Sequence, residues 1–163
     1  MIEYSLFSED IEKSKRVTTE LDSNKAWNKF ECKNNYIGFL GELFFDKYLR
    51  DTGIEGYWLN FVEDGKGWND PDFIINDKTV DVKTTYSNGL WFQKPKFDVY
   101  VYVNISRDNS KLNIVGFVTK EYLEFCIRYG LAKKIKRGNR IDYVLDKYYL
   151  NDIGQLGGEC DDK

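Results

Sequence analysis

Three side chains on two neighbouring stretches of the chain carry the charges that chemistry on a phosphate ester needs. Asp72 follows Pro71, and Asp81 and Lys83 lie two residues apart further along the chain. Residues two apart in an extended strand share a face, so Asp81 and Lys83 should point the same way. Two carboxylates can hold a divalent cation, and an ammonium group can stabilise the negative charge that develops on phosphate. Asp72, Asp81 and Lys83 are therefore candidate catalytic residues.

The residues between these two stretches predict a tight β-hairpin. A two-residue turn at Asn76 and Asp77 sets Asp72 opposite Asp81, with their Cβ atoms about 4.5–5.5 Å apart. Carboxylates at that separation repel each other unless a positive charge lies between them. A divalent cation bound by Asp72 and Asp81 meets that need, with the backbone carbonyl of Val82 as a candidate third ligand.

The absence of histidine narrows the chemistry further. The sequence contains no His, which excludes Ser-His-Asp triads, histidine general bases, HNH-type nuclease chemistry and histidine zinc ligands. Metal binding must then use carboxylate and carbonyl oxygens, which favour hard ions. The expected cofactor is therefore Mg²⁺ or Mn²⁺.

Pro71-Asp72 followed by Asp81-Val82-Lys83 resembles the motif of the PD-(D/E)XK nuclease superfamily, which has the restriction-endonuclease-like fold. The resemblance implies that Asp72 and Asp81 bind the metal ion. It also implies that Lys83 assists the attacking water or stabilises the transition state, and that DNA is the substrate.

An acidic residue on the preceding helix extends this resemblance. Members of the family often carry one, and Glu42 in Gly38-Phe-Leu-Gly41-Glu42 matches it. Glu42 is thus a further catalytic candidate that would bind a second ion or a water, or orient the other groups. Each mid-helix glycine costs about 1 kcal/mol relative to alanine, so we expect Gly38 and Gly41 to let the helix approach the sheet closely. The alternative is a solvated helical Glu42.

The resemblance covers about residues 35–118 and includes one departure. Relatives usually place a helix after the strand that bears Asp-x-Lys, whereas residues 86–96 of this chain predict an irregular loop. Many members of the family are dimers, so the resemblance also implies a homodimer.

Hydrophobic spacing predicts an α/β fold with a restriction-endonuclease-like core, in which helices flank a central mixed β-sheet. The expected helices cover residues 8–28, 35–51 and 119–129, the last between a Thr119 cap and Gly130. The expected strands cover residues 56–62, 72–75, 79–84, 98–105 and 113–118, with a strand pair within 141–150. The chain is expected to form one domain: an N-terminal helical extension (1–30), a core with the active site (35–118), a C-terminal helix and basic segment (119–153) and a frayed tail (154–163).

A basic segment is the candidate contact with nucleic acid. The net charge of −3, from 24 basic and 27 acidic residues, does not itself predict such binding, so any phosphate contact must come from a local patch. The candidates in this segment are Lys133, Lys134, Lys136, Arg137 and Arg140. The alternative is a solvated run of charges.

The loops on either side of the motif supply further candidates. Gln93 and Lys94 are possible contacts to nucleic acid. Trp68, Trp91 and Phe92 could stack on bases, or they could anchor these loops in the core.

The remaining composition bears on the setting of the protein. No apolar run of about 18 residues is present, so no membrane span and no membrane partner are expected. The three cysteines, Cys32, Cys126 and Cys160, match no zinc-binding spacing. Free thiols are typical of a reducing compartment, which predicts a cytoplasmic protein.

Together these features predict a metal-dependent nuclease that hydrolyses phosphodiester bonds in DNA as an endonuclease. One alternative is a non-catalytic nucleic-acid-binding protein that retains the nuclease fold. Another is a structural or interaction protein in which the motif is accidental.

Overall fold

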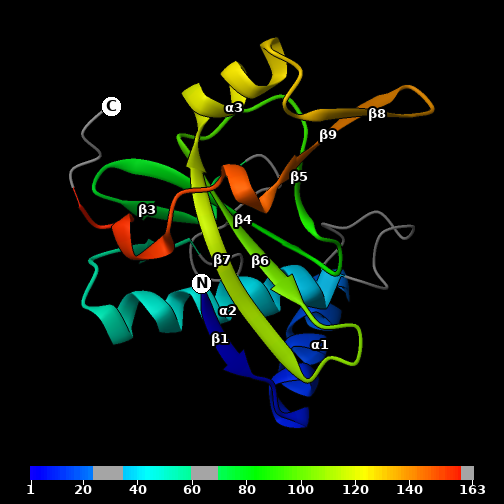
Figure 1. Cartoon of the computed structure of the whole chain (residues 1–163). Helices are drawn as coiled ribbons and strands as arrows, with labels where there is room; N and C mark the ends of the chain where they lie inside the picture. The colour runs from blue at the N-terminus through cyan, green and yellow to red at the C-terminus, as the bar shows by residue number, and fades with distance from the viewer. Residues whose placement is uncertain (24–34, 60–69, 159–163) are drawn as a thin grey trace.

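A six-stranded mixed sheet forms the centre of the part of the chain that the structure, a computed structural model, describes: residues 1–23, 35–59 and 70–158 (Figure 1). The strand order is β1-β7-β6-β4-β3-β2, and neighbouring strands are antiparallel except for the parallel pair β4 and β6. Its strands are β1 (Ile2–Ser5), β2 (Tyr57–Trp58), β3 (Phe73–Ile75), β4 (Lys78–Thr85), β6 (Val99–Ile105) and β7 (Lys111–Thr119).

A smaller sheet and three helices complete the described residues. The sheet has the order β5-β9-β8 and is antiparallel. Its strands are β5 (Gly89–Phe92), β8 (Lys133–Arg137) and β9 (Arg140–Asp146). The helices are α1 (Ser8–Ser23), α2 (Asn35–Thr52) and α3 (Lys120–Arg128), with short 3₁₀ turns η2 (Lys147–Tyr149) and η3 (Ile153–Gln155).

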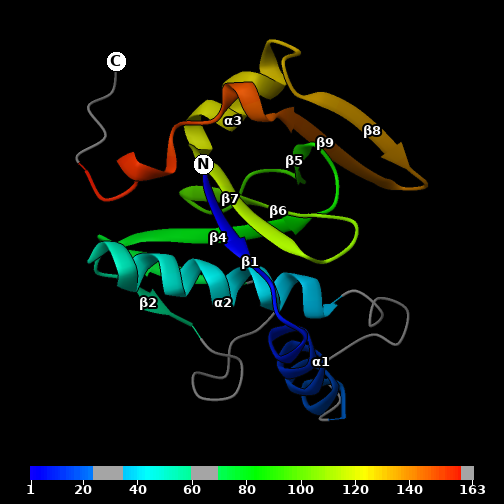
Figure 2. The ribbon, with the colours of Figure 1, turned by 60° about the horizontal axis from the view of Figure 1, so that its bottom comes forward.

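The large sheet lies between two layers. Figure 2 shows α2 along one side of β4, while α3 and the small sheet lie on the opposite side. One hydrophobic cluster joins α2 to Val80 and Val82 of β4 and to the odd-numbered positions of β6. A second cluster joins Tyr100 and Tyr102 of β6 to β5, β7, β9 and α3. Burial on both faces accounts for the unbroken apolar run at the start of β6. The expected α/β fold, with helices flanking a central mixed sheet, is confirmed.

Helix α2 packs closely on β4 through one glycine. A Cβ atom added at Gly41 would lie 1.8 Å from Oγ1 of Thr84, so no larger residue fits without movement. A Cβ atom at Gly38 would meet nothing within 4 Å. The close approach expected at Gly41 is therefore confirmed, and the one expected at Gly38 is wrong because that position faces open space.

The helix ends follow the local sequence. The chain leaves α2 at Gly53, whose φ of 70° is a left-handed conformation that suits glycine. Thr119 caps α3 by accepting a hydrogen bond from the Tyr122 amide at 3.4 Å, and Gly130 follows the helix with a φ of 73°. Both expected boundaries are confirmed.

Three expectations about secondary structure are wrong. Residues 86–96 contain strand β5 rather than only a loop. The basic segment is itself strand β8, which pairs with β9, so the strand pair begins earlier than expected. The tail does not fray from residue 154, because η3 forms there and Leu156 is buried in the core. The end of the first expected helix, the strand beyond Leu59, and Trp68 lie outside the described residues.

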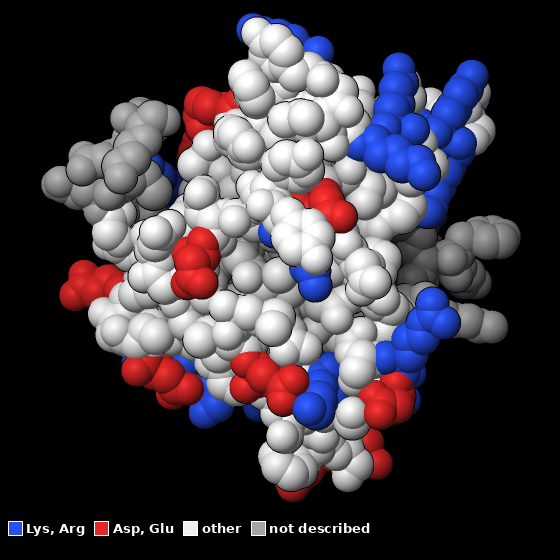
Figure 3. Space-filling view, viewed as in Figure 1, with Lys and Arg blue, Asp and Glu red and all other residues white. Residues whose placement is uncertain are grey.

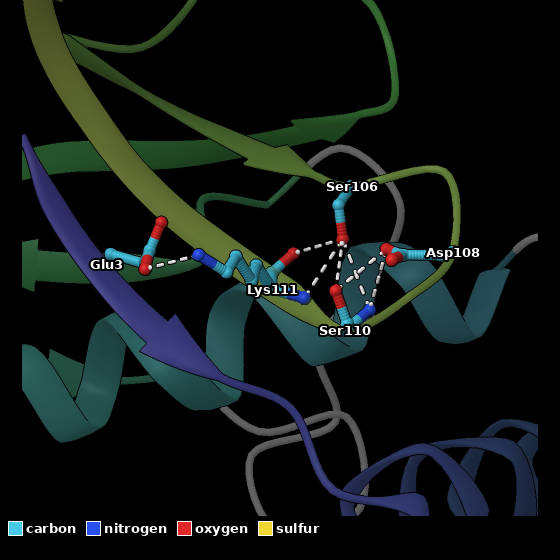
Figure 4. A network of polar contacts seen from close by, with 5 residues as sticks. All are labelled: Glu3, Ser106, Asp108, Ser110 and Lys111. Carbon is cyan, nitrogen blue, oxygen red and sulfur yellow. Dashed lines mark hydrogen bonds and ion pairs between the residues drawn. The ribbon is translucent and has the colours of Figure 1, made fainter.

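Polar contacts fix β1 at the edge of the sheet and close the β6–β7 turn (Figure 4). Lys111 pairs with Glu3 at 3.0 Å. In the turn, Oγ of Ser106 accepts hydrogen bonds from the amides of Ser110 and Lys111. Hydrogen bonds from Ser106 and Ser110 lower the pKa of Asp108 to about 2, so this exposed carboxylate stays ionised.

In the described part of the chain, no helix has the length and apolarity to cross a membrane.

Candidate active site

The β3–β4 hairpin brings Asp72 to β4. Its turn residues Asn76 and Asp77 have φ values of 49° and 61°, which suits a two-residue hairpin turn. Phe73 pairs with Val80, so the predicted register is confirmed and Asp72 and Asp81 come next on their two strands.

The side-chain carboxylate of Asp72 then serves as the hydrogen-bond acceptor for a backbone amide of β4. Its Oδ2 accepts a hydrogen bond from the amide of Val82 at 2.7 Å. Asp72 is 8% exposed and Asp81 is 5% exposed. Two carboxylates are thus buried on neighbouring strands where β3 begins.

Lys83 compensates the charge of Asp81. Its Nζ lies 2.9 Å from Oδ1 and 2.7 Å from Oδ2 of Asp81. Burial disfavours the charged form of Lys83, but Asp81, and then Asp72, outweigh this effect and raise the pKa of Lys83. The lysine therefore remains an ammonium group at neutral pH.

The alternation of β4 separates the packing residues from the chemical ones. Val80, Val82 and Thr84 face α2, so Asp81 and Lys83 face the other layer. There they line a hollow of about 360 Å³. Its other charged or amide-bearing residues are Gln93, Lys94, Lys96, Arg140 and Asp142, and its aromatic residues are Trp91, Phe92, Phe97 and Tyr100.

Tyr100 fixes the segment that carries the lysines of the hollow. It lies beside Asp81 in the parallel β4–β6 pair. Its hydroxyl accepts hydrogen bonds from the amides of Lys96 and Phe97 at 2.8 and 3.2 Å. The connection from β5 to β6 is thereby held at the rim of the hollow.

Strand β9 contributes a buried acid with two arginine partners. Asp142 is 2% exposed. Nε of Arg140 lies 2.6 Å from Oδ1 of Asp142, and Nε of Arg137 lies 3.8 Å from Oδ2. The Arg137 guanidinium also lies 4.5 Å from the centre of the Trp91 ring. The two ion pairs lie within the β8–β9 hairpin, and the contact between Arg137 and Trp91 links that hairpin to β5.

The structure divides the basic segment between two faces. Arg140 lines the hollow together with Gln93 and Lys94, as expected of contacts near the site. Lys133 and Arg137 share a face with Trp91 and Arg140 through the β5–β9–β8 register.

Lys134 and Lys136 alternate with these residues and therefore lie on the opposite face. Figure 3 shows Lys and Arg side chains gathered where the hairpin extends. The basic residues are thus close together in sequence but lie on two opposite faces of the small sheet.

The sequence did not single out four residues of the hollow. Lys96 and Phe97 lie at the end of the expected 86–96 loop, and Tyr100 and Asp142 lie in segments predicted only as strands. A signal for Asp142 was present in its position two residues after Arg140, since strand neighbours at that spacing share a face.

Glu42 lies apart from the hollow lining. Its Oε2 accepts a hydrogen bond from Nε1 of Trp58 at 3.1 Å, and the Trp58 ring stacks on Phe73. Glu42 is 8% exposed, so the alternative of a solvated helical Glu42 is wrong. Among the residues that the structure describes, no three acidic or cysteine side chains form a group that could hold a metal ion.

A smaller donor set nevertheless suits a hard cation. Asp72 and Asp81 supply buried carboxylate oxygens. The N–H and C=O of a strand residue point to the same edge, and the Val82 N–H points to Asp72, so the Val82 carbonyl belongs to the same edge of β4. Oxygen-only ligands of this kind are those that Mg²⁺ or Mn²⁺ prefers.

One solved structure that the chain resembles is a viral nuclease. It is D212, a nuclease from a fusselovirus, with 12% sequence identity and a TM-score of 0.42. The similarity covers 80% of this chain and 91% of that one. So distant a likeness carries no functional argument, and function must be inferred from the site. No protein-family model and no curated protein sequence matches the chain.

Proposed function

We propose that this protein is a metal-dependent nuclease that hydrolyses phosphodiester bonds in DNA and acts as an endonuclease. The observation that carries the proposal is the β3–β4 hairpin, which places buried Asp72 beside Asp81 and Lys83. Two adjacent buried carboxylates repel each other and lose hydration, and the single ammonium of Lys83 balances only one of their two charges, so a bound cation would stabilise the pair.

The residues of the site have distinct roles in this proposal. Asp72, Asp81 and the Val82 carbonyl would hold Mg²⁺ or Mn²⁺, which lowers the pKa of a bound water and polarises the scissile phosphate. Lys83 donates hydrogen bonds to the phosphate oxygens as negative charge develops on them. Glu42, held by Trp58, orients the groups around it or holds a water or a second ion.

The charge of the hollow supports an anionic substrate. Its lining includes four cationic side chains, Lys83, Lys94, Lys96 and Arg140, against the two carboxylates of Asp81 and Asp142, a surplus of two positive charges. The whole chain has a net charge of −3. Positive charge is therefore concentrated next to the candidate catalytic residues, where a DNA backbone would bind.

A cleavage assay tests the proposal directly. Supercoiled plasmid and labelled oligonucleotides are incubated with the protein in Mg²⁺, in Mn²⁺ and in EDTA. We expect internal cleavage with either metal ion and none in EDTA. A matched control is Lys47→Ala, because Lys47 is exposed on α2, on the other side of the large sheet from the hollow. Absence of cleavage under every condition, with DNA binding retained, would favour the non-catalytic binder instead.

A homodimer and a cytoplasmic location belong to the same proposal. The reduced state of Cys126, a buried free thiol, is compatible with such a compartment. Sedimentation velocity of the purified protein tests the homodimer, and a single species at the monomer mass would contradict it.

A further inference from the structure

The walls of the hollow combine aromatic rings with positive charge. Trp91 and Phe97 are partly exposed at its lining, whereas Phe92 and Tyr100 are buried. Arg137 lies over the Trp91 ring, and Nζ of Lys96 lies 5.3 Å from the centre of the Phe97 ring. Aromatic faces beside cations are typical of sites where unpaired bases stack and their phosphates are held.

The two acids of the hollow are each paired with cationic side chains, so the positive charges of Lys94 and Lys96 remain as the surplus toward a ligand. Asp81 is paired with Lys83, and Asp142 is paired with Arg140 and Arg137. The ion pair also restricts Arg140, because its Nε is held 2.6 Å from a carboxylate oxygen that cannot move far in the core. Asp142 is therefore a positioning residue for the Arg140 guanidinium, which keeps further N–H groups for a phosphate.

The size of the hollow sets a limit on what enters it. A volume of about 360 Å³ is at the small end of ligand pockets, which span roughly 300–1,000 Å³. Asp81 lies at its lining and is almost completely buried, so the group that reacts must enter the hollow. A base that is paired and stacked inside a duplex cannot offer its face to Trp91 or Phe97, but an unpaired base can.

We propose that the hollow binds one unpaired nucleotide next to the scissile phosphate, with the base against Trp91 and the phosphate on Arg140. The substrate is then a nucleic acid with a single-stranded segment, such as a flap, a gap or a free strand. This inference rests on the proposed nuclease function, because it takes the Asp81–Lys83 end of the hollow as the reacting end.

Binding without cleavage tests the inference separately from catalysis. Fluorescence anisotropy in EDTA measures the affinity of the wild-type protein for three oligonucleotides: a single strand, the matched duplex, and that duplex with an unpaired flap. We expect the single strand and the flapped duplex to bind about tenfold more tightly than the plain duplex, the effect of stacking one base. Equal affinity for all three would overturn the proposal.

Variants of residues in the hollow then test whether the preference for unpaired strands arises there. Trp91→Leu should remove most of it and Trp91→Phe should keep it, with thermal melts to show that both variants fold. Arg140→Gln should lower the slope of log affinity against log salt by about 0.7 for the single strand. Lys47→Ala, at an exposed lysine of α2 on the other side of the large sheet, should leave the preference unchanged. A preference that survives both Trp91→Leu and Arg140→Gln would contradict the proposed pocket.

The Asp142→Asn variant shows whether Asp142 positions Arg140 or only repels the phosphate. Loss of a carboxylate that only repels phosphate would tighten binding, whereas loss of the group that holds Arg140 should weaken it severalfold. The two proposals also fail in different ways. Cleavage without any preference for unpaired strands would reject the pocket alone, and a clear preference without cleavage in metal ions would reject the nuclease alone.

Discussion

Replacement of Gly41 by alanine should destabilise the protein because of one close contact between α2 and β4. The new Cβ would lie 1.8 Å from Oγ1 and 2.9 Å from Cβ of Thr84, so either the side chain or the helix must move. Such overpacking typically costs about 1–3 kcal/mol. Alanine returns about 1 kcal/mol through its higher helix propensity. We therefore expect a net loss of up to about 2 kcal/mol in the free energy of unfolding.

Gly38 provides a matched control in the same helix. A Cβ atom there meets nothing within 4 Å, so Gly38→Ala should gain about 1 kcal/mol from propensity alone. Thr84→Ala should relieve most of the cost of Gly41→Ala, because it removes the two atoms 1.8 and 3.1 Å from the new Cβ. In a double-mutant cycle this predicts a coupling energy of about 1 kcal/mol.

Urea denaturation followed by tryptophan fluorescence measures all five proteins under the same conditions: the wild type, the three single variants and the Gly41→Ala/Thr84→Ala double variant. Because β4 carries Asp81 and Lys83, a shift of α2 against Thr84 should also lower cleavage by Gly41→Ala. Equal stability of Gly41→Ala and Gly38→Ala, or an unchanged cost of Gly41→Ala in the Thr84→Ala background, would contradict a clash between the new Cβ and Thr84.

Three further predictions address the site and the hairpin. Asp81→Asn and Lys83→Ala should each lower cleavage by about 10²–10³-fold, and wild-type cleavage by either variant would remove that residue from the mechanism. The melting temperature should change little for Asp81→Asn but fall for Lys83→Ala, which leaves the buried Asp81 carboxylate without its ammonium partner. Hydrogen bonds from the Thr79 hydroxyl and amide lower the pKa of Asp98. The ionised Asp98 should therefore stabilise the fold fully above about pH 4, and this stabilisation should be lost as the pH falls below that value. The unfolding free energies of the wild type and Asp98→Asn should then converge in acid. Asp77→Gly should stabilise the protein by about 1 kcal/mol, because Asp77 has a φ of 61° that glycine adopts without strain; an unchanged urea midpoint would contradict this.

Local sequence alone determined the parts of the site that depend on neighbouring residues. The Asn76-Asp77 turn tolerates left-handed backbone, so it fixes a register that places Asp72 beside the Asp81 strand. The two-residue period of a strand then sets Asp81 and Lys83 on one face. The end of α2 at Gly53 and the start of α3 at Thr119 were also predictable, because capping and left-handed turns are satisfied within a few residues.

Only the tertiary structure decided what surrounds that motif. Residues 89–92 have no strong period of their own and become β5 because β9, more than 45 residues later, offers its edge. The same pairing turns the β8–β9 hairpin so that Arg140 reaches the hollow while Lys134 lies on the other face. Likewise, Gly38 and Gly41 look equivalent in sequence, and only the position of Thr84 makes one of them essential. Charge and turn propensity are properties of the local chain, whereas a hollow exists only where segments distant in sequence pack together.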